Sequence, residues 1–177
     1  MDEYTQLARK TAENFVKTGE IINSPQNLPE VFYNAQKAVF VTIHKHEENN
    51  RICLRGCIGT LEPTKSNIAE EIIQNAIWAC RDDNRFLPVT EKELDKLTYE
   101  VSLLDHPEQI YSTQDLDPKK YGVIIRTEDG RTGLLLPDIE GVESPLHQVE
   151  IAARKGCIDV DRDEFSLFRF TVEKHKE

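Results

Sequence analysis

The stretch YGVIIRTEDGRTGLLLP at 121–137 is the strongest constraint on how this chain can fold. Its two apolar runs flank Asp129-Gly130, a dipeptide that suits a tight turn with positive backbone angles, so the stretch predicts a β-hairpin. A second hairpin is predicted where the alternating run at 38–44 returns through 51–58. Strands joined by short turns run antiparallel, so we expect antiparallel or mixed sheet built from hairpins.

Helices are predicted between these hairpins. The longer ones are an amphipathic helix over residues 2–18 that ends at Gly19, a helix that Ser66 caps and that runs to about Arg81, and a helix from Ser144-Pro145 to Gly156. A short helix should follow the capping box at 90–93, and strands are predicted at 99–104 and 165–172. Hairpins with helices between them favour an α+β fold with packed helices over a doubly wound parallel sheet.

Composition excludes several classes of function. The formal net charge of −10 argues against a nucleic-acid binder, because such proteins use basic surfaces to neutralise phosphates. No apolar run approaches the ~20 residues of a membrane span. The N-terminus lacks the basic and apolar regions of a secretory signal, so we expect a cytoplasmic protein with no membrane contact. The length of 177 residues suits one domain, or one domain with a small appended lobe, and the lack of a long linker predicts a single domain over residues 1–177.

The segment RICLRGCIGT at 51–60 is the main candidate for chemistry. If it is a regular strand, one face carries Arg51, Cys53, Arg55 and Cys57, and the other, core-facing side carries Ile52, Leu54, Gly56 and Ile58. Positive neighbours lower the pKa of a thiol, and the glycines beside Cys57 would let a ligand or another backbone approach closely. The segment therefore indicates either an anion pocket with a reactive thiol or a strand whose small cysteines pack under a helix.

The four cysteines are expected to be reduced, because they are too scattered for a disulfide framework. On one strand the Cα atoms of Cys53 and Cys57 would lie ~13 Å apart, beyond the reach of a disulfide. Cys53 could bind zinc with His44 and His46 of the facing strand; the alternative is that both histidines are solvated turn residues. No CxxC pair is present, and we expect no metal and no cofactor. His175 lies in a charged tail and is expected to face solvent.

The heptapeptide LRGCIGT at 54–60 resembles the signature of the AMME-syndrome candidate-region (AMMECR) protein family. The segment DNRFLPVTEKEL at 83–94 is similar to a second block of that family, and YEVSLL, YGVIIR and RTGLLLP agree with later strands in order and spacing. The continuation at 137–158 resembles the bacterial branch known as AmmeMemoRadiSam system protein A. The similarity extends over nearly the whole chain, from the first predicted helix to the FRFTV strand.

The resemblance implies an α+β fold with a larger and a smaller lobe that form a cleft, near which the signature segments gather. It implies a gene neighbourhood with a Memo-like protein and a radical SAM protein, which are therefore the expected partners, but it implies no reaction. Leu87 stands where many members have a proline, a departure without chemical consequence. The motif positions that become candidate ligand-binding residues are Arg55, Gly56, Gly59, Thr60, Arg85 and Phe86.

Two functions follow as alternatives. In the first, a cleft lined by 54–60 and 83–88 binds a small anionic ligand or a segment of a Memo-like or radical SAM partner. In the second, Cys57 is the nucleophile of an enzyme that acts on a small metabolite, and Arg55 lowers the pKa of its thiol. The sequence alone does not decide between these two functions, and it does not give the oligomeric state.

Asp83 also has two interpretations. As a catalytic candidate it would be the base beside the thiol, a role that demands hydrogen-bond reach and that a distant histidine could fill instead. As a structural residue it would form an ion pair with Arg81, Arg85 or Arg55, because an acidic group at a helix C-terminus opposes the helix dipole.

Overall fold

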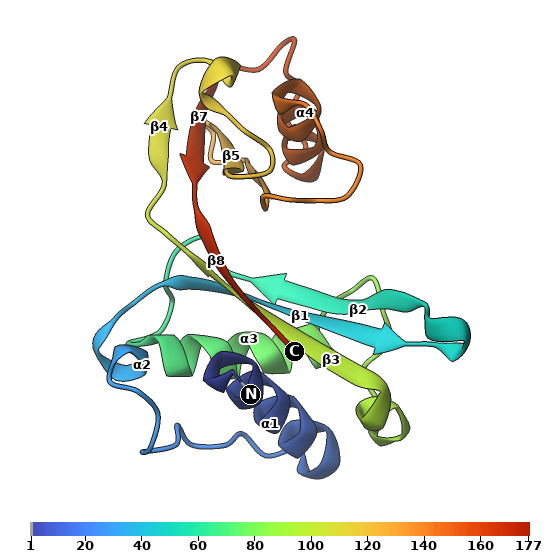
Figure 1. Cartoon of the computed structure of the whole chain (residues 1–177). Coiled ribbons are helices and arrows are strands. Elements are labelled where there is room, and N and C mark those ends of the chain that lie inside the picture. The colour runs from blue at the N-terminus through green and yellow to red at the C-terminus, as the bar shows by residue number, and fades with distance from the viewer. Residues whose placement is uncertain (1) are drawn as a thin grey trace. The chain divides into compact units, whose positions relative to one another are not determined.

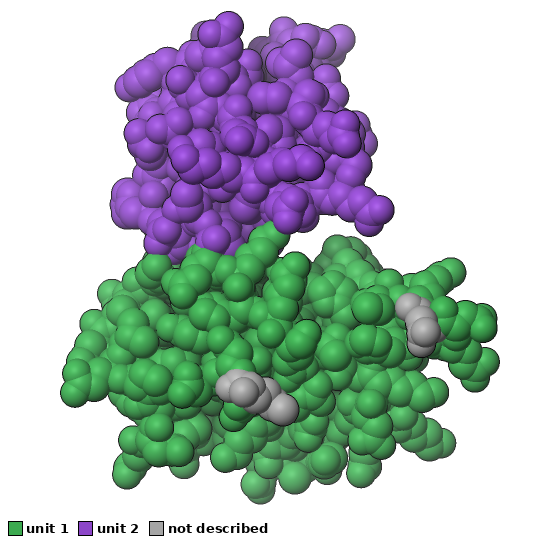
Figure 2. Space-filling view, viewed as in Figure 1, with its two compact units in different colours: residues 1–103, 173–177 green, residues 104–172 purple. Residues whose placement is uncertain are grey.

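The computed structural model describes residues 2–177, apart from the side chain of Asn50, and divides into two compact units. Unit 1 contains the chain through Leu103 and the segment Glu173–Glu177, and unit 2 contains Leu104–Val172 (Figure 2). Unit 2 is thus an insertion in unit 1, and each unit has its own hydrophobic core. No helix in the described residues is both long and apolar enough to cross a membrane.

Unit 1 is built on a four-stranded sheet. Its elements are α1 (Glu3–Thr18), α2 (Val31–Asn34), β1 (Ala38–His46), η1 (Glu48–Asn50), β2 (Ile52–Gly59), α3 (Ile68–Arg81), η2 (Glu91–Lys96), β3 (Leu97–Leu104) and β8 (Val172–Lys176). The strands lie in the order β2-β1-β3-β8, so β2 and β8 are the two edges of the sheet. Helices α1 and α3 lie together on one side of this sheet (Figure 1).

The face of the sheet that lies against the helices is called the inner face. Val41 and Ile43 of β1 and Val101 of β3 are fully buried there, in one cluster with Ile72 and Ile77 of α3. Because side chains alternate along a strand, the residues between these positions point to the opposite face, called the outer face. This division decides where each candidate residue on β2 points.

Unit 2 is a smaller sheet covered by one helix. Its elements are β4 (Glu108–Ile110), η3 (Thr113–Asp115), β5 (Gly122–Thr127), β6 (Thr132–Leu135), α4 (Pro145–Lys155) and β7 (Phe165–Phe170). The strand order is β4-β7-β5-β6, with antiparallel pairing. At Gly133 of β6 a Cβ would lie 1.8 Å from the carbonyl oxygen of Ala152, so glycine is what allows α4 to approach the strand this closely.

The α+β fold is confirmed, and both predicted hairpins form where the turn residues place them. β1 pairs with β2, and β5 with β6, each antiparallel. In the second hairpin Gly130 has a φ of 90°, the left-handed conformation, whereas Asp129 does not have a positive φ, so only the glycine meets the expectation of positive backbone angles. The predicted helix ends that are confirmed are Gly19 after α1, Ser144 and Gly156 around α4, and the capping box of Thr90 and Glu93 before η2.

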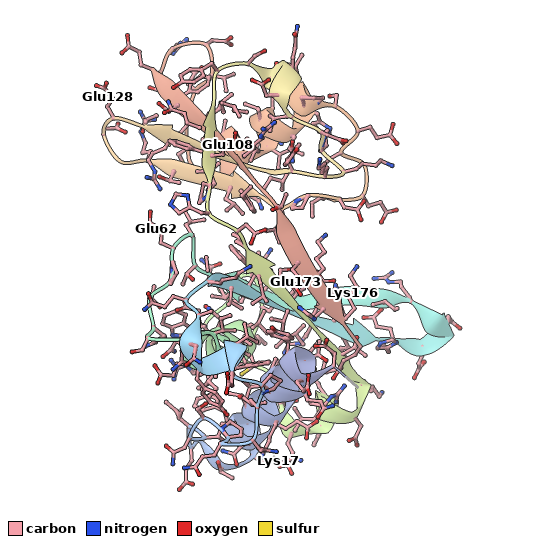
Figure 3. All side chains as sticks on the ribbon, turned by 60° about the vertical axis from the view of Figure 1, so that its left-hand side comes forward. Lys17, Glu62, Glu108, Glu128, Glu173 and Lys176 are labelled. Atoms are coloured by element: carbon pink, nitrogen blue, oxygen red, sulfur yellow. The ribbon has the colours of Figure 1, made fainter. Side chains whose placement is uncertain are left out.

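Two predicted boundaries are wrong. α3 is capped by Asn67 rather than Ser66, because the Asn67 side chain accepts a hydrogen bond from the backbone N–H of Glu70 at 2.9 Å. The single strand predicted at 165–172 divides at Thr171 into β7 and β8, and β8 pairs into the sheet of unit 1. The supposed charged tail is therefore an edge strand, whose charged side chains include Glu173 and Lys176 (Figure 3).

His175 on this strand is largely buried, so the expectation that it faces solvent is wrong. Its ring stacks on Tyr4 with the centroids 4.0 Å apart, and its Nδ1 lies 2.8 Å from Oδ2 of Asp2. Glu177 accepts hydrogen bonds from Nε and Nη2 of Arg9 at 2.8 and 2.6 Å. His175 and Glu177 thus hold α1 against the sheet. The polar composition of the segment gave no sign of this role.

Candidate functional site

A β-bulge interrupts the candidate segment at Arg55. The pairs on either side of it are Ile43 with Gly56 and His44 with Leu54, so β2 has one residue more than β1 across this interval. An extra residue reverses the alternation of side chains along the bulged strand. The prediction of two uniform faces over 51–58 is therefore wrong.

The reversal explains which side chains of β2 are exposed. Cys57 is on the outer face, opposite Thr42 of β1, as the alternation predicts from that end of the strand. Beyond the bulge, Ile52 and Leu54 also turn to the outer face, where they are 58% and 40% exposed rather than part of the core. Cys53 falls on the inner face, so it does not share a face with Cys57.

The two glycines beside Cys57 have contacts within the protein. A Cβ on Gly56 would lie 2.2 Å from the carbonyl oxygen of Ala79, so this glycine allows α3 to lie directly against β2. A Cβ on Gly59 would lie 2.2 Å from the ring of Phe40 on the facing strand. Of the two uses expected for these glycines, the structure shows the approach of another part of the protein.

Asp83 and Arg85 occupy the exposed edge of β2 at Cys57. The backbone N–H of Cys57 donates to Oδ2 of Asp83 at 2.8 Å, and Nη2 of Arg85 donates to the carbonyl of Cys57 at 3.2 Å. The two side chains thus satisfy the outward backbone groups as a neighbouring strand would. They also pair with each other, through Nε to Oδ1 at 2.9 Å and Nη2 to Oδ2 at 2.7 Å.

This pairing sets the electrostatics of the edge. The hydrogen bonds from Arg85 lower the pKa of Asp83 to about 2, against the opposing effect of burial, and the N–H of Cys57 adds to the decrease. Asp83 raises the pKa of Arg85 in return, and the Cys57 thiol contributes to that rise. A carboxylate with so low a pKa is a weak base at neutral pH. The geometry fits the ion-pair interpretation of Asp83.

Arg55 forms an ion pair with Glu93. Its Nε and Nη2 donate to the two carboxylate oxygens of Glu93 at 3.0 and 3.1 Å, and Nη2 also reaches the carbonyl of Pro88 at 3.3 Å. Lys45 adds a third cationic contact to Glu93 at 2.8 Å. Hydrogen bonds from Arg55 and Lys45 hold the pKa of Glu93 well below its usual range despite burial. The bulge therefore exchanges the expected roles: Arg85, not Arg55, is the arginine at the thiol.

Thr42 is a polar neighbour of the thiol on the outer face. The hydroxyl of Thr42 donates to Sγ of Cys57 at 3.3 Å. His44 is two residues along β1 from Thr42, so its side chain also belongs to the outer face. Neither residue stands out in the sequence, because the cross-strand register is what brings them near the cysteine.

Phe86 joins the two arginines. The guanidinium carbons of Arg55 and Arg85 lie 5.9 and 5.5 Å from the centre of its ring. Within unit 1 the structure therefore brings together Arg55, Cys57, Asp83, Arg85 and Phe86, which we call the Arg85 site.

Thr60 points elsewhere, to a residue that the sequence analysis missed. Its hydroxyl donates at 2.7 Å to Glu71, a fully buried carboxylate on α3. The backbone N–H groups of Thr64 and Lys65 also donate to Glu71, at 2.8 and 2.7 Å. Glu71 thus holds the loop that follows the signature. The available signal was its position three residues after Ile68, on the apolar side of the helix.

The residues considered as zinc ligands do not converge. Cys53 is on the inner face, whereas His44 and His46 are on the outer face, and Nε2 of His46 lies 3.1 Å from the hydroxyl of Thr98. Over residues 2–177 the structure holds no group of three His, Cys, Asp or Glu side chains arranged to bind a metal ion.

Comparison with known proteins adds family relationships to this geometry. A model of the AMMECR1 family matches residues 5–175. A protein of Thermotoga maritima is 44% identical over 173 residues, which cover 98% of this chain and 97% of that protein. A protein of Clostridium acetobutylicum is 43% identical over 177 residues, but these make up only 36% of its length. The crystal structure of an uncharacterized protein from Pyrococcus horikoshii superposes with a TM-score of 0.88 at 30% identity, covering 98% of this chain and 89% of that one.

Proposed function

The chain belongs to the AMMECR1 family, and we propose that it is a binding module whose Arg85 site holds the anionic group of a ligand. The carboxylate or phosphate belongs to a small molecule or to a segment of a partner protein. One observation carries this proposal: the guanidinium of Arg85 is held in place by a carboxylate that is only 4% exposed, while the Arg85 side chain itself is 51% exposed. A cation with a fixed orientation lies at the surface.

The fixed orientation favours anion binding. Asp83 and the carbonyl of Cys57 hold the guanidinium before any ligand arrives, so little side-chain entropy is lost on binding. A planar guanidinium matches the geometry of carboxylate and phosphate groups. The ring of Phe86 beside it offers an apolar surface for the rest of a ligand.

The local charge supports the same proposal. The ion pairs in and beside the Arg85 site contain three cationic side chains, Lys45, Arg55 and Arg85, against the two carboxylates of Asp83 and Glu93. This is a locally positive region in a chain whose formal net charge is −10. Such a region concentrates anions where the rest of the surface repels them.

We further propose that the ligand group is supplied by partner proteins in the cytoplasm. The chain would act as a member of the bacterial AmmeMemoRadiSam branch, with a Memo-like protein and a radical SAM protein as its partners. The Clostridium acetobutylicum relative supports a partner role, because there the matched region is attached to a longer polypeptide.

The test compares Arg85 with Arg81, the last residue of α3. Arg81 forms a similar surface pair with Asp82 and is 49% exposed, but it is not part of the Arg85 site. We expect Arg85→Ala to abolish the chemical-shift changes that succinate and inorganic phosphate cause at Cys57 and Phe86, and to prevent capture of the purified Memo-like and radical SAM proteins. Arg81→Ala should preserve both. Equal binding by Arg85→Ala and the wild type would refute the proposal.

A second candidate function, an enzyme with Cys57 as nucleophile and a small metabolite as substrate, is favoured by two contacts. The Thr42 hydroxyl donates to the sulfur, and the Arg85 guanidinium binds the carbonyl of the same cysteine and interacts with its thiol, so both would stabilise a thiolate. His44, on the same face, is the histidine that would handle protons. The backbone N–H of Cys57 is engaged by Asp83, so it does not serve an oxyanion, and for this reason we place the binding module first.

The second candidate is tested by the rates at which iodoacetamide alkylates the four cysteines across a pH series, read by peptide mass spectrometry. Exposed Cys157 and buried Cys80, the pKa of which burial raises to about 11, are the fast and slow internal references. If Cys57 is a stabilised thiolate, it reacts well below pH ~8.5, and Arg85→Ala slows it. If Cys57 reacts as slowly as Cys80, its thiol is only packed and the enzyme candidate fails.

A further inference from the structure

β2 is an edge strand, and the described contacts close only part of its edge. At Cys57 the outward backbone groups are bound by Asp83 and Arg85. The bulge at Arg55 then breaks the regular spacing of the strand. Both are devices by which proteins prevent an edge from pairing with another chain. Neither extends to the segment Ile52–Leu54.

The backbone groups of Ile52 and Leu54 point outward from the sheet. The N–H of Glu47 donates to the carbonyl of Arg51 at 2.8 Å, so Arg51 is bonded toward β1. Positions that bond to the partner strand alternate with positions that do not in an antiparallel pair. The residues whose backbone N–H and C=O groups point away from β1 are therefore Ile52 and Leu54. Among the described groups, no side chain and no loop bonds to either of them.

The exposed part of the edge is also apolar. Ile52 and Leu54 are among the large hydrophobic side chains that the structure leaves exposed, and both turn to the outer face. An edge with unpaired backbone groups and apolar side chains is a template for an added strand. Proteins normally blunt such an edge with charge or proline, and this segment contains neither.

Charge indicates what kind of strand fits. Arg51, which is largely exposed and pairs with Glu47 at 3.4 Å, precedes the apolar segment. Arg85 lies beyond it at Cys57, about 10 Å from Leu54 along the strand. Leu87, two residues after Arg85, is almost fully exposed. Cationic side chains at both ends of an apolar edge complement an acidic, extended segment.

We propose that an extended segment of a partner protein, with apolar residues at alternate positions and acidic residues near its ends, adds as a strand to the Ile52–Leu54 edge. Main-chain hydrogen bonds supply affinity, the alternate side chains contact Ile52 and Leu54, and a carboxylate binds Arg85. This inference rests on the proposed function of the Arg85 site and names the occupant of that site.

The experiment selects random twelve-residue peptides on the immobilised full chain and measures the enriched peptides by fluorescence anisotropy. We expect acidic peptides with alternating apolar residues. Leu54→Pro removes the outward N–H without breaking the ladder to β1, and should weaken binding about tenfold, whereas Leu54→Ala, which keeps the N–H, should weaken it less. Failure to enrich such peptides, or equal affinity for Leu54→Pro, overturns the inference.

A second measurement uses the wild-type protein, in case Leu54→Pro does not fold. Bound peptide should slow the hydrogen exchange of the amides of Ile52 and Leu54, and unchanged exchange of both overturns the inference. Titration of folded Leu54→Pro with succinate separates the two proposals. Succinate binding at Arg85 that survives in this variant upholds the Arg85 site even if no strand is added at the edge.

Discussion

The carboxylate of Asp83 performs two tasks at once: it closes the β2 edge at Cys57 and it orients Arg85. Its pKa is lower in the folded protein than in the unfolded chain, so it stabilises the fold whenever pH exceeds its unfolded pKa of ~3.9. That stabilisation disappears as the pH falls through about 2, where the folded protein also binds the proton.

We therefore expect Asp83→Asn to destabilise the protein by about 2 kcal/mol at pH 7 and to have almost no effect near pH 2. Urea unfolding of both proteins at several pH values between 2 and 7 measures the difference. Asp82→Asn is the matched control, because Asp82 is more exposed and its pair with Arg81 should contribute less than about 0.5 kcal/mol. A pH-independent effect of Asp83→Asn would mean that its charge is irrelevant to the edge.

The roles of individual residues at the site were the hardest feature to predict from the sequence. The ion pair of Asp83 with an arginine could be expected, because an acid at a helix end needs compensation. Which arginine interacts with the thiol could not be predicted. A bulge at Arg55 has no distinct sequence signature, and it reverses the direction of every side chain beyond it. Glu71 was missed because a carboxylate in the first turn of a helix is ordinarily explained by the helix dipole.

At the scale of elements, the contact between β2 and α3 depends on the absence of a side chain. Gly56→Ala would place Cβ against the backbone carbonyl of Ala79, which cannot move without shifting the helix. We expect a loss of about 3 kcal/mol in the free energy of unfolding, measured by urea titration.

Gly59→Ala provides the comparison, because its Cβ would meet the ring of Phe40, a side chain that can rotate away. We expect Gly59→Ala to cost only about 1 kcal/mol in the free energy of unfolding. The same substitution should cost less when it is made in the Phe40→Ala variant than in the wild type. If the two glycine variants were equally unstable, the close approach of α3 would not be what requires Gly56.

Elements with local signals were predictable, and elements stabilised at long range were not. Asp129-Gly130, Ser144-Pro145 and the Thr90 capping box each determine a structure within a few residues of themselves. β8 has no such signal: its alternation of charged residues becomes a strand only because β3 offers an edge and α1 offers Tyr4 and Arg9.

For the whole molecule, the important feature is that unit 1 is discontinuous in sequence. Ending the chain at Thr171 would remove β8, and with it the contacts of His175 and Glu177 to α1. We expect hydrogen exchange in α1 and β3 to become at least about tenfold faster, while β5 and β6 keep their protection because the core of unit 2 contains no residue of β8.

Hydrogen exchange with mass spectrometry of the full and shortened chains provides the readout. Lys174→Ala in the full chain is the control, since it preserves the backbone of β8. Unchanged protection of α1 in the shortened chain would show that β8 is dispensable for unit 1. Loss of protection in β5 and β6 would show that the units do not fold separately.

The position of β8 also determines the order of events during synthesis. Residues up to Leu103 leave the ribosome first, but their sheet lacks its fourth strand until Val172–Lys176 has also emerged. Translation at ~5–20 residues per second makes that interval, in which unit 2 itself is synthesised, last several seconds. The part of the protein that is synthesised first is therefore completed last, and nascent β3 exposes an unpaired edge to chaperones throughout the interval.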